Sequence, residues 1–169
     1  MNEYVIEKSS TRAKGIKTKE IITDGLRGSF YLSEHSVPYY KSYKKIIDSI
    51  VINCITGITI GTTFGANSIS FIWTFNPVSN NFDIYVYIIH KFTEHIKYVS
   101  SVNVNEKVFY NICISDGIPY INLDNREILV DDNIRYQDKT IKSVNYPTYS
   151  LTTGGAPHLI KVHAEYNPY

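Results

Sequence analysis

Alternation of large apolar and small polar side chains is the feature of this sequence that most constrains its fold. In residues 68–75, SISFIWTF, the side chains Ile69, Phe71, Trp73 and Phe75 share one parity, and serine and threonine fill most of the other. A period of two places neighbouring side chains on opposite faces of a β-strand. The stretch therefore predicts a strand with one face in a hydrophobic core.

The next apolar run, residues 82–89, repeats the period and adds a polar, aromatic face. Burial of one large apolar side chain stabilises a fold by about 1.5–3 kcal/mol, so several such strands can hold a domain together without a cofactor. We therefore expect a charge at Trp73 or Ile84 to unfold the domain. The apolar set of this run is Phe82, Ile84, Val86 and Ile88, and the opposite set is Asp83, Tyr85 and Tyr87.

Ten short runs of strand-like character follow one another along the chain. Asn80-Asn81 and Asp116-Gly117 separate neighbouring runs and are typical of two-residue hairpin turns, because these residues tolerate positive φ. A brief helix at residues 41–50 is an alternative for the first run. The predicted strands are 46–52, 58–62, 68–75, 82–89, 95–102, 107–114, 118–123, 127–130, 140–144 and 159–164. This spacing predicts an all-β antiparallel sandwich or barrel.

Length and composition restrict the class of protein. A chain of 169 residues suffices for one domain with its own core. An apolar content of 43% excludes a disordered chain, and no window reaches the ~18 uninterrupted apolar residues of a membrane span. The first residues lack the pattern of a signal peptide, so we expect synthesis in a cytoplasm and no membrane partner. A net charge of +1 argues against nucleic-acid binding by the whole domain.

The first 28 residues show no sustained apolar period and are predicted to form an N-terminal arm, with the sandwich domain at residues 29–169. Five basic residues and no acidic one lie between positions 8 and 19. They are candidates to anchor the arm on an acidic partner chain or a nucleic acid, and a solvated basic segment is the alternative. These residues are Lys8, Arg12, Lys14, Lys17 and Lys19.

No catalytic centre is recognisable in the sequence. Cys54 and Cys113 each lie inside an apolar run, where we expect buried thiols rather than a nucleophile or a disulfide. Gly-x-Ser-x-Gly, phosphate-binding and dinucleotide-binding motifs are absent from the sequence. Asp83, Glu94 and Glu106 stand apart in the sequence, so the pair of carboxylates that a glycosidase uses is not recognisable. We therefore predict a protein that is not an enzyme and has no cofactor.

Histidine and acidic clusters are predicted to be structural. His90 with His95, and His158 with His163, are five residues apart, which on one strand places the two rings on opposite faces. The segment 131–133, Asp-Asp-Asn, lacks the spaced ligands of a calcium loop and is expected to form a solvated turn. We expect no metal site.

Four tyrosines on the exposed parity of their runs form the candidate ligand or partner face. An aromatic ring can stack on a sugar while its hydroxyl forms hydrogen bonds. Tyrosine is also enriched at protein interfaces, and cross-strand aromatic pairs stabilise plain sheet surfaces, so three interpretations stay open. The residues are Tyr85, Tyr87, Tyr98 and Tyr120.

Two stretches resemble one group of proteins. Residues 68–125, from SISFIWTF to YINLDN, resemble the strand succession of concanavalin-like, laminin-G-type jelly rolls, especially the small versions encoded by tailed phages of gut bacteria. LTTGGAPHLIKVHAEY, residues 151–166, resembles their closing segment. The phage proteins insert several residues after the second glycine, and this chain does not. Gly154, Gly155 and Pro157 are predicted to shape a backbone turn, and His158 to begin the strand that follows, so we expect no site at Thr153, Gly154, Gly155 and His158.

The resemblance covers residues 55–164 and implies both a fold and a function. The implied fold is an antiparallel, concanavalin-like jelly-roll β-sandwich with an extended N-terminal arm. The implied function is that of a non-enzymatic virion protein made in the host cytoplasm, an outer capsid decoration or head-fibre component. Its arm would bind other virion proteins or further copies of the chain. The alternative is a lectin-like, carbohydrate-binding module that recognises bacterial surface glycans.

Overall fold

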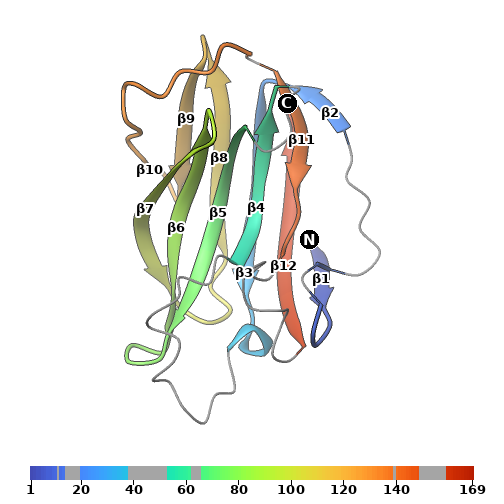
Figure 1. Ribbon diagram of the computed structural model, residues 1–169. Helices are drawn as coiled ribbons and strands as arrows, with labels where there is room; N and C mark the ends of the chain where they lie inside the picture. Colours follow the sequence, from blue (N-terminus) through green and yellow to red (C-terminus); the bar gives the residue numbers. More distant parts are fainter. Residues whose placement is uncertain (11, 14–19, 38–52, 62–65, 139, 149–158) are drawn as a thin grey trace.

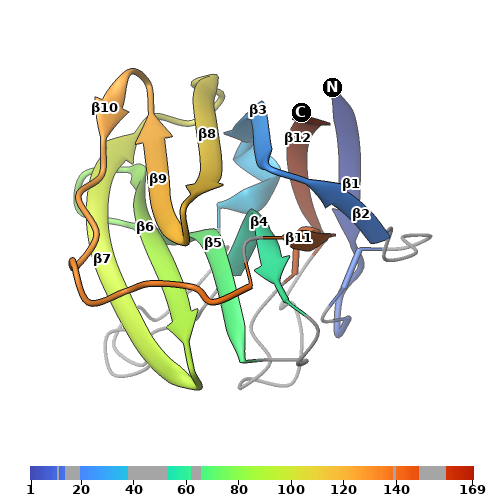
Figure 2. The same cartoon turned by 90° about the horizontal axis from the view of Figure 1, so that it is seen from above.

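The computed structural model describes residues 1–10, 12–13, 20–37, 53–61, 66–138, 140–148 and 159–169. These residues form two antiparallel β-sheets of six strands each, stacked face to face (Figure 1). Seen from above, the sheets make two layers (Figure 2). The described helical structure is one 3-10 turn, η1 (Glu34–Ser36), and no described helix has the length and apolar character to cross a membrane.

Each sheet is assembled from strands that lie far apart in the sequence. Sheet A contains β1 (Asn2–Ile6), β3 (Gly25–Leu32), β8 (Val108–Ser115), β9 (Ile118–Leu123), β10 (Arg126–Glu127) and β12 (Ile160–Pro168). Sheet B contains β2 (Glu20–Thr23), β4 (Asn53–Ile60), β5 (Asn67–Asn76), β6 (Asn81–His90), β7 (Thr93–Val102) and β11 (Ile141–Asn145). The spatial orders are β1-β12-β3-β8-β9-β10 and β2-β11-β4-β5-β6-β7. The run from β4 to β7 is thus a meander of successive hairpins.

The hydrophobic core lies between the two sheets. Phe30 of β3 and Phe71 of β5 meet across the sandwich with their ring centroids 6.2 Å apart. The Trp73 ring packs edge-on against Phe82 at 5.2 Å. Trp73 and Ile84, the two positions where a charge is expected to unfold the domain, are both buried. The core parity predicted for β5 and β6 is therefore confirmed.

The nine predicted strands that fall on described residues each overlap an observed strand. The two-residue hairpin turn predicted at Asp116-Gly117 is confirmed, since Ser115 pairs with Ile118 and φ is 51° at Asp116 and 78° at Gly117. The turn predicted at Asn80-Asn81 is wrong in its bounds, because Asn76 pairs with Asn81 and residues 77–80 connect the two strands, with φ of 54° at Asn80. The predicted strand 46–52, the alternative helix 41–50 and the turn at residues 153–158 lie outside the described residues.

The predicted division into an arm and a domain is not confirmed. Residues 2–6 form β1, which pairs with β12 and buries Tyr4 and Ile6 in the core. Strand β3 runs across the predicted boundary at residue 28. Its Gly28 resembles a turn residue in the sequence. A Cβ atom there would lie 1.9 Å from the Glu165 carbonyl oxygen, so close packing of two strands requires this glycine.

Some of the candidate anchoring residues lie within the described residues and the others lie outside them. Lys8 and Arg12 are exposed, and Arg12 forms an isolated β-bridge with Thr148. Lys14, Lys17 and Lys19 lie outside the described residues. The anchoring role of these basic residues stays a prediction.

Candidate functional site

The candidate site is the face of sheet B that points away from the core. Directly paired residues of an antiparallel ladder share a face, so the register identifies this surface. In Figure 1, β4 to β7 lie in front of β3, β8 and β9, and this face points toward the reader. We call it the tyrosine face. It comprises Ser70, Ile72 and Thr74 of β5, Asp83, Tyr85, Tyr87 and Ile89 of β6, and Glu94, Ile96, Tyr98 and Ser101 of β7.

Three of the four predicted tyrosines meet on this face. Tyr85 and Tyr98 are direct partners in the ladder, and their rings pack edge to face with centroids 5.6 Å apart. Tyr87 lies two residues farther along β6, opposite Ile96. Tyr98 is 53% exposed and Ile96 is 42% exposed, whereas Ser70 in the neighbouring β5 is buried. The site thus offers an exposed aromatic ring at the β7 edge and half-buried rings beside it.

A chain of hydrogen bonds holds the exposed ring of Tyr98. Ser101 Oγ donates to Asp83 Oδ1, and the Tyr98 hydroxyl lies 3.0 Å from Ser101 Oγ. Because the single Ser101 hydroxyl hydrogen goes to Asp83, the Tyr98 hydroxyl donates to Ser101. Asn76 Nδ2 donates to the second Asp83 oxygen at 3.2 Å. The Tyr98 oxygen and the remaining lone pairs of Asp83 are left as acceptors on this face.

The far end of the face carries a second carboxylate, that of Glu94, which lies opposite Ile89. Burial, followed by the hydrogen bond and negative charge of Glu94, raises the pKa of Tyr87 to about 12. The Tyr87 hydroxyl donates its hydrogen bond to Glu94, so its oxygen is left as an acceptor.

Asp83 and Glu94 are too far apart to act as a hydrolytic pair. Asp83 is opposite Ser101, and Glu94 is opposite Ile89, so the two acids are six positions apart along β6. At about 3.3 Å per residue this is about 20 Å, whereas paired glycosidase carboxylates are about 5–9.5 Å apart. The prediction that these acids do not pair agrees with the register.

Polar groups of β4 and β11 adjoin the site and were not identified from the sequence. Asn145 Nδ2 donates to Ser70 Oγ at 3.0 Å, and Thr59 Oγ1 donates to Asn145 Oδ1 at 3.0 Å. Asn145 pairs with Gly57, which places it in the row that leads to Ser70 and Tyr87. Only the pairing of β11 with β4, which are about 85 residues apart, brings these groups together, and sequence spacing carries no signal for it.

Tyr120 does not belong to the site. It lies on β9 in sheet A, opposite Cys113, and is 42% exposed between the buried Pro119 and Ile121. It therefore points away from the core on the opposite side of the sandwich. Its exposed parity was predicted correctly, but parity does not specify the sheet.

The histidine spacing argument holds only within one strand. Lys91 and Phe92 form a turn, so His90 and His95 lie on adjacent strands and share one face. The predicted placement on opposite faces is wrong for this pair. Within the described residues, no group of three or more His, Cys, Asp or Glu side chains is arranged to hold a metal ion. The segment 131–133 forms the expected turn, in which Asn133 N donates to Asp131 Oδ1.

Cys54 and Cys113 are free thiols rather than a disulfide, as predicted, but both are half-buried rather than buried. Burial, reduced in part by a hydrogen bond with Ser70, raises the pKa of Cys54 to about 12. A thiol with this pKa stays protonated at neutral pH and is a poor nucleophile.

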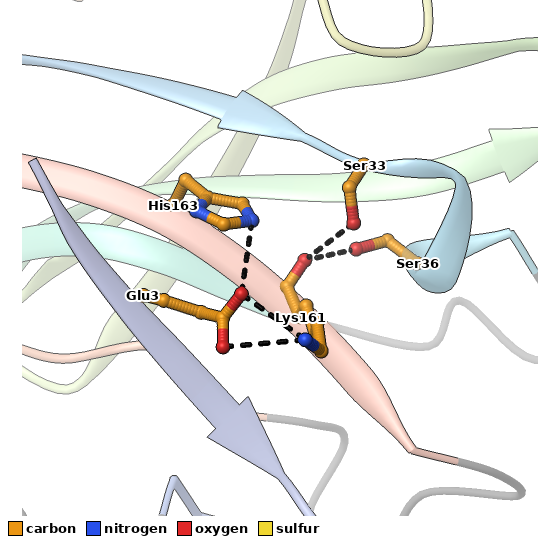
Figure 3. A network of polar contacts seen from close by, with 5 residues as sticks. All are labelled: Glu3, Ser33, Ser36, Lys161 and His163. Carbon is orange, nitrogen blue, oxygen red and sulfur yellow. Dashed lines mark hydrogen bonds and ion pairs between the residues drawn. The ribbon is translucent and has the colours of Figure 1, made fainter.

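The opposite face of the sandwich carries a polar network that joins β1 to β12 (Figure 3). Lys161 Nζ donates to Glu3 Oε2 at 3.2 Å, and His163 Nε2 lies 3.6 Å from the same oxygen. The His163 ring stacks on Tyr31 with centroids 4.2 Å apart. Ser36 Oγ of η1 donates to the Lys161 carbonyl oxygen at 2.6 Å. The network fastens the edge strand and η1, which fits the structural role predicted for His163.

This network predicts a loss of stability in mild acid. Burial lowers the pKa of His163 below its ordinary value of 6.5. The negative charge of Glu3 raises this pKa, and the positive charges of Lys161 and His35 lower it, with a net decrease. The unfolded chain therefore binds the proton more readily. The contribution of His163 to the free energy of unfolding should be fully present at a pH well above 6.5 and be lost as the pH falls through the folded pKa. Denaturant titrations across this range should show the fall, and His163→Gln should remove the His163 contribution.

Comparisons with known proteins define the fold. No protein-family model matches the chain, and no curated protein matches its sequence. Its structure is similar to that of alginate lyase AlyC3 in complex with dimannuronate, with a TM-score of 0.64, 10% identity, and coverage of 98% of this chain and 73% of that chain. The PL7 alginate lyase AlyA1 from Zobellia galactanivorans matches with a TM-score of 0.51, 10% identity and coverage of 95% and 72%.

A glycoside hydrolase of family GH16 from Bacteroides ovatus, in complex with the G4G4G3G product, is also similar. Its TM-score is 0.50, with 9% identity and coverage of 97% of this chain and 78% of that chain. At such identities the likeness shows the fold alone. The predicted concanavalin-like jelly-roll sandwich is confirmed.

The comparisons contradict the predicted virion role and the prediction that the chain is not an enzyme. The three solved proteins are carbohydrate-active enzymes, and no comparison supports a phage origin or virion partners. The prediction failed because it rested on strand succession and on the closing segment. Both features are set by the packing of a jelly roll and recur in proteins of this fold whatever their function.

Proposed function

We propose that this chain binds oligosaccharides on the tyrosine face. The observation that carries the proposal is the exposed ring of Tyr98 beside Tyr85, next to the hydrogen-bonding groups of Asp83. A sugar presents C–H groups that pack on an aromatic ring, and hydroxyls that need donors and acceptors around that ring. The fold supports the proposal, since AlyC3 was solved with dimannuronate and the GH16 enzyme with a glucan product.

Each group on the face has a defined task in this proposal. The Tyr98 ring stacks on one sugar unit, and its oxygen accepts a hydrogen bond from a sugar hydroxyl. Asp83 is held by Ser101 and Asn76, so it accepts a further hydrogen bond without reorganising. Tyr87 extends the surface along β6 toward the next sugar units.

Calorimetric titration with a panel of oligosaccharides tests this proposal. Tyr98→Ala should weaken binding roughly tenfold, because an aromatic contact of about 1.4 kcal/mol corresponds to a factor of ten. Tyr120→Ala is the matched control, since it removes a comparably exposed ring from the opposite side of the sandwich. Equal weakening by both variants, or no binding of any oligosaccharide, would contradict the proposal.

The same mixtures should be examined for shortened products, because the proteins of similar fold are lyases and hydrolases. Product formation that Tyr98→Ala slows and Tyr120→Ala does not would extend the proposal from binding to cleavage on this face.

A further inference from the structure

The charged side chains of β6 and β7 are sorted between the two sides of sheet B. Asp83 and Glu94 lie on the tyrosine face, opposite Ser101 and Ile89. His95 and Lys97 are opposite Ile88 and Val86, whose side chains point into the core, so they lie on the other side. His90 is two residues after Ile88 on β6, so it lies on the same side of the sheet as His95 and Lys97. Over the described residues of β4 to β7, the tyrosine face therefore carries two carboxylates and no lysine, arginine or histidine. Lys142 belongs to β11, which lies four strands away from the β7 strand of Tyr98.

Two of these basic side chains, Lys97 and His90, are held by hydrogen bonds on the side of sheet B that faces the core. Lys97 Nζ donates to the Leu129 carbonyl oxygen at 2.7 Å. His90 Nε2 lies 3.0 Å from the Arg135 carbonyl oxygen, and its ring packs edge-on against Tyr136. Both contacts are made with the segment that follows β10. These side chains are therefore directed away from any ligand on the tyrosine face.

This distribution of charge bears on the class of glycan that the face accepts. The carboxylate of an acidic sugar loses hydration on binding and needs a cationic partner or several strong donors in return. It would also be repelled by Asp83 and Glu94. An uncharged sugar needs only hydrogen-bond partners and an aromatic surface, and the face provides both. On the basis of the proposed function, we infer that the tyrosine face selects uncharged glycans over polyuronates.

A comparison of two tetrasaccharides tests this inference with the full chain. A neutral mixed-linkage glucan tetrasaccharide should bind at least about tenfold more tightly than tetramannuronate at low salt. The difference should narrow at about 1 M salt, where the Debye length falls to about 3 Å. Glu94→Gln should strengthen tetramannuronate binding about threefold at low salt, because it removes one repelling charge and keeps the size of the side chain.

Lys97→Gln is the matched control, since it changes the charge by the same amount on the same strand but on the opposite side. It should leave the preference for the neutral sugar unchanged. Tetramannuronate binding as tight as that of the glucan would overturn the inference and leave the proposed function intact. If no oligosaccharide binds at all, the proposed function fails and the inference fails with it.

Discussion

Replacing Ile84 with aspartate is expected to abolish the native fold. Ile84 is 0% exposed at the centre of β6, between Trp73 on β5 and Ser100 on β7. The substitution loses about 1.5–3 kcal/mol of hydrophobic burial and adds several kcal/mol for a buried carboxylate without a partner. This sum is comparable to the total stability of about 5–15 kcal/mol that is usual for a domain. Near-ultraviolet circular dichroism and size-exclusion chromatography should show the loss of fixed tertiary structure.

Ile96→Asp is the control for this experiment. It makes the same chemical change on the adjacent strand, but its side chain lies on the tyrosine face and is 42% exposed. We expect a change in stability within about 0.5 kcal/mol, as is usual for surface substitutions. A folded Ile84→Asp variant together with an unfolded Ile96→Asp variant would mean that the two faces of sheet B are exchanged.

The second large effect is expected from Gly28→Ala in the middle of β3. The new Cβ would lie 1.9 Å from the Glu165 carbonyl oxygen and 2.8 Å from the Tyr110 hydroxyl. The Glu165 backbone cannot move freely, because β12 is paired with β1 on one side and β3 on the other. Overpacking usually costs about 1–3 kcal/mol, and we expect about 3 kcal/mol here. For a chain of this length that corresponds to a melting temperature about 6–12 °C lower.

Gly25→Ala, in the same strand, provides the matched comparison. Its Cβ would also collide, at 2.4 Å, but with the ring of Tyr169 rather than with backbone. The Tyr169 side chain is 50% exposed, so it can rotate away at the cost of its hydrogen bond to Asn111 and its contact with Arg27. Thermal melts should therefore show a small decrease for Gly25→Ala and a large one for Gly28→Ala. Equal melting temperatures would show that strand spacing at Gly28 adapts to a methyl group.

Local side-chain patterns sufficed to predict most of the strands and their buried faces. The alternation in residues 68–75 and 82–89 requires one buried face, and the observed register agrees at Trp73 and Ile84. Strand β3 was missed because Gly25 and Gly28 resemble turn residues. Glycine is needed at position 28 because β12, more than 130 residues later in the chain, packs closely against it. A local sequence pattern cannot predict a contact between residues so far apart in the chain.

The candidate site was predictable only in part, for the same reason. Tyr85, Tyr87 and Tyr98 come together because β6 and β7 form a hairpin, whose register depends on a short turn. Tyr120 has the same exposed parity but lies in the other sheet. The hydrogen bonds that link Asp83, Ser101 and Tyr98 depend on a register shift between β6 and β7 near Tyr85. No feature of the sequence predicts this shift.

Taken alone, the sequence determined which side chains of β5 and β6 face inward, where the β8–β9 hairpin turns, and that a hydrophobic core holds the chain as a β-protein. These properties depend on residues close together in the sequence, so the alternation within one strand of sufficient length is enough to predict them. Only the tertiary structure decided which outward faces form one surface, and therefore that Asp83 and Glu94 share a face with Tyr98 while Lys97 lies on the other side of the sheet. Strand order and register depend on contacts between distant parts of the chain, and a shift by one residue would exchange the two faces.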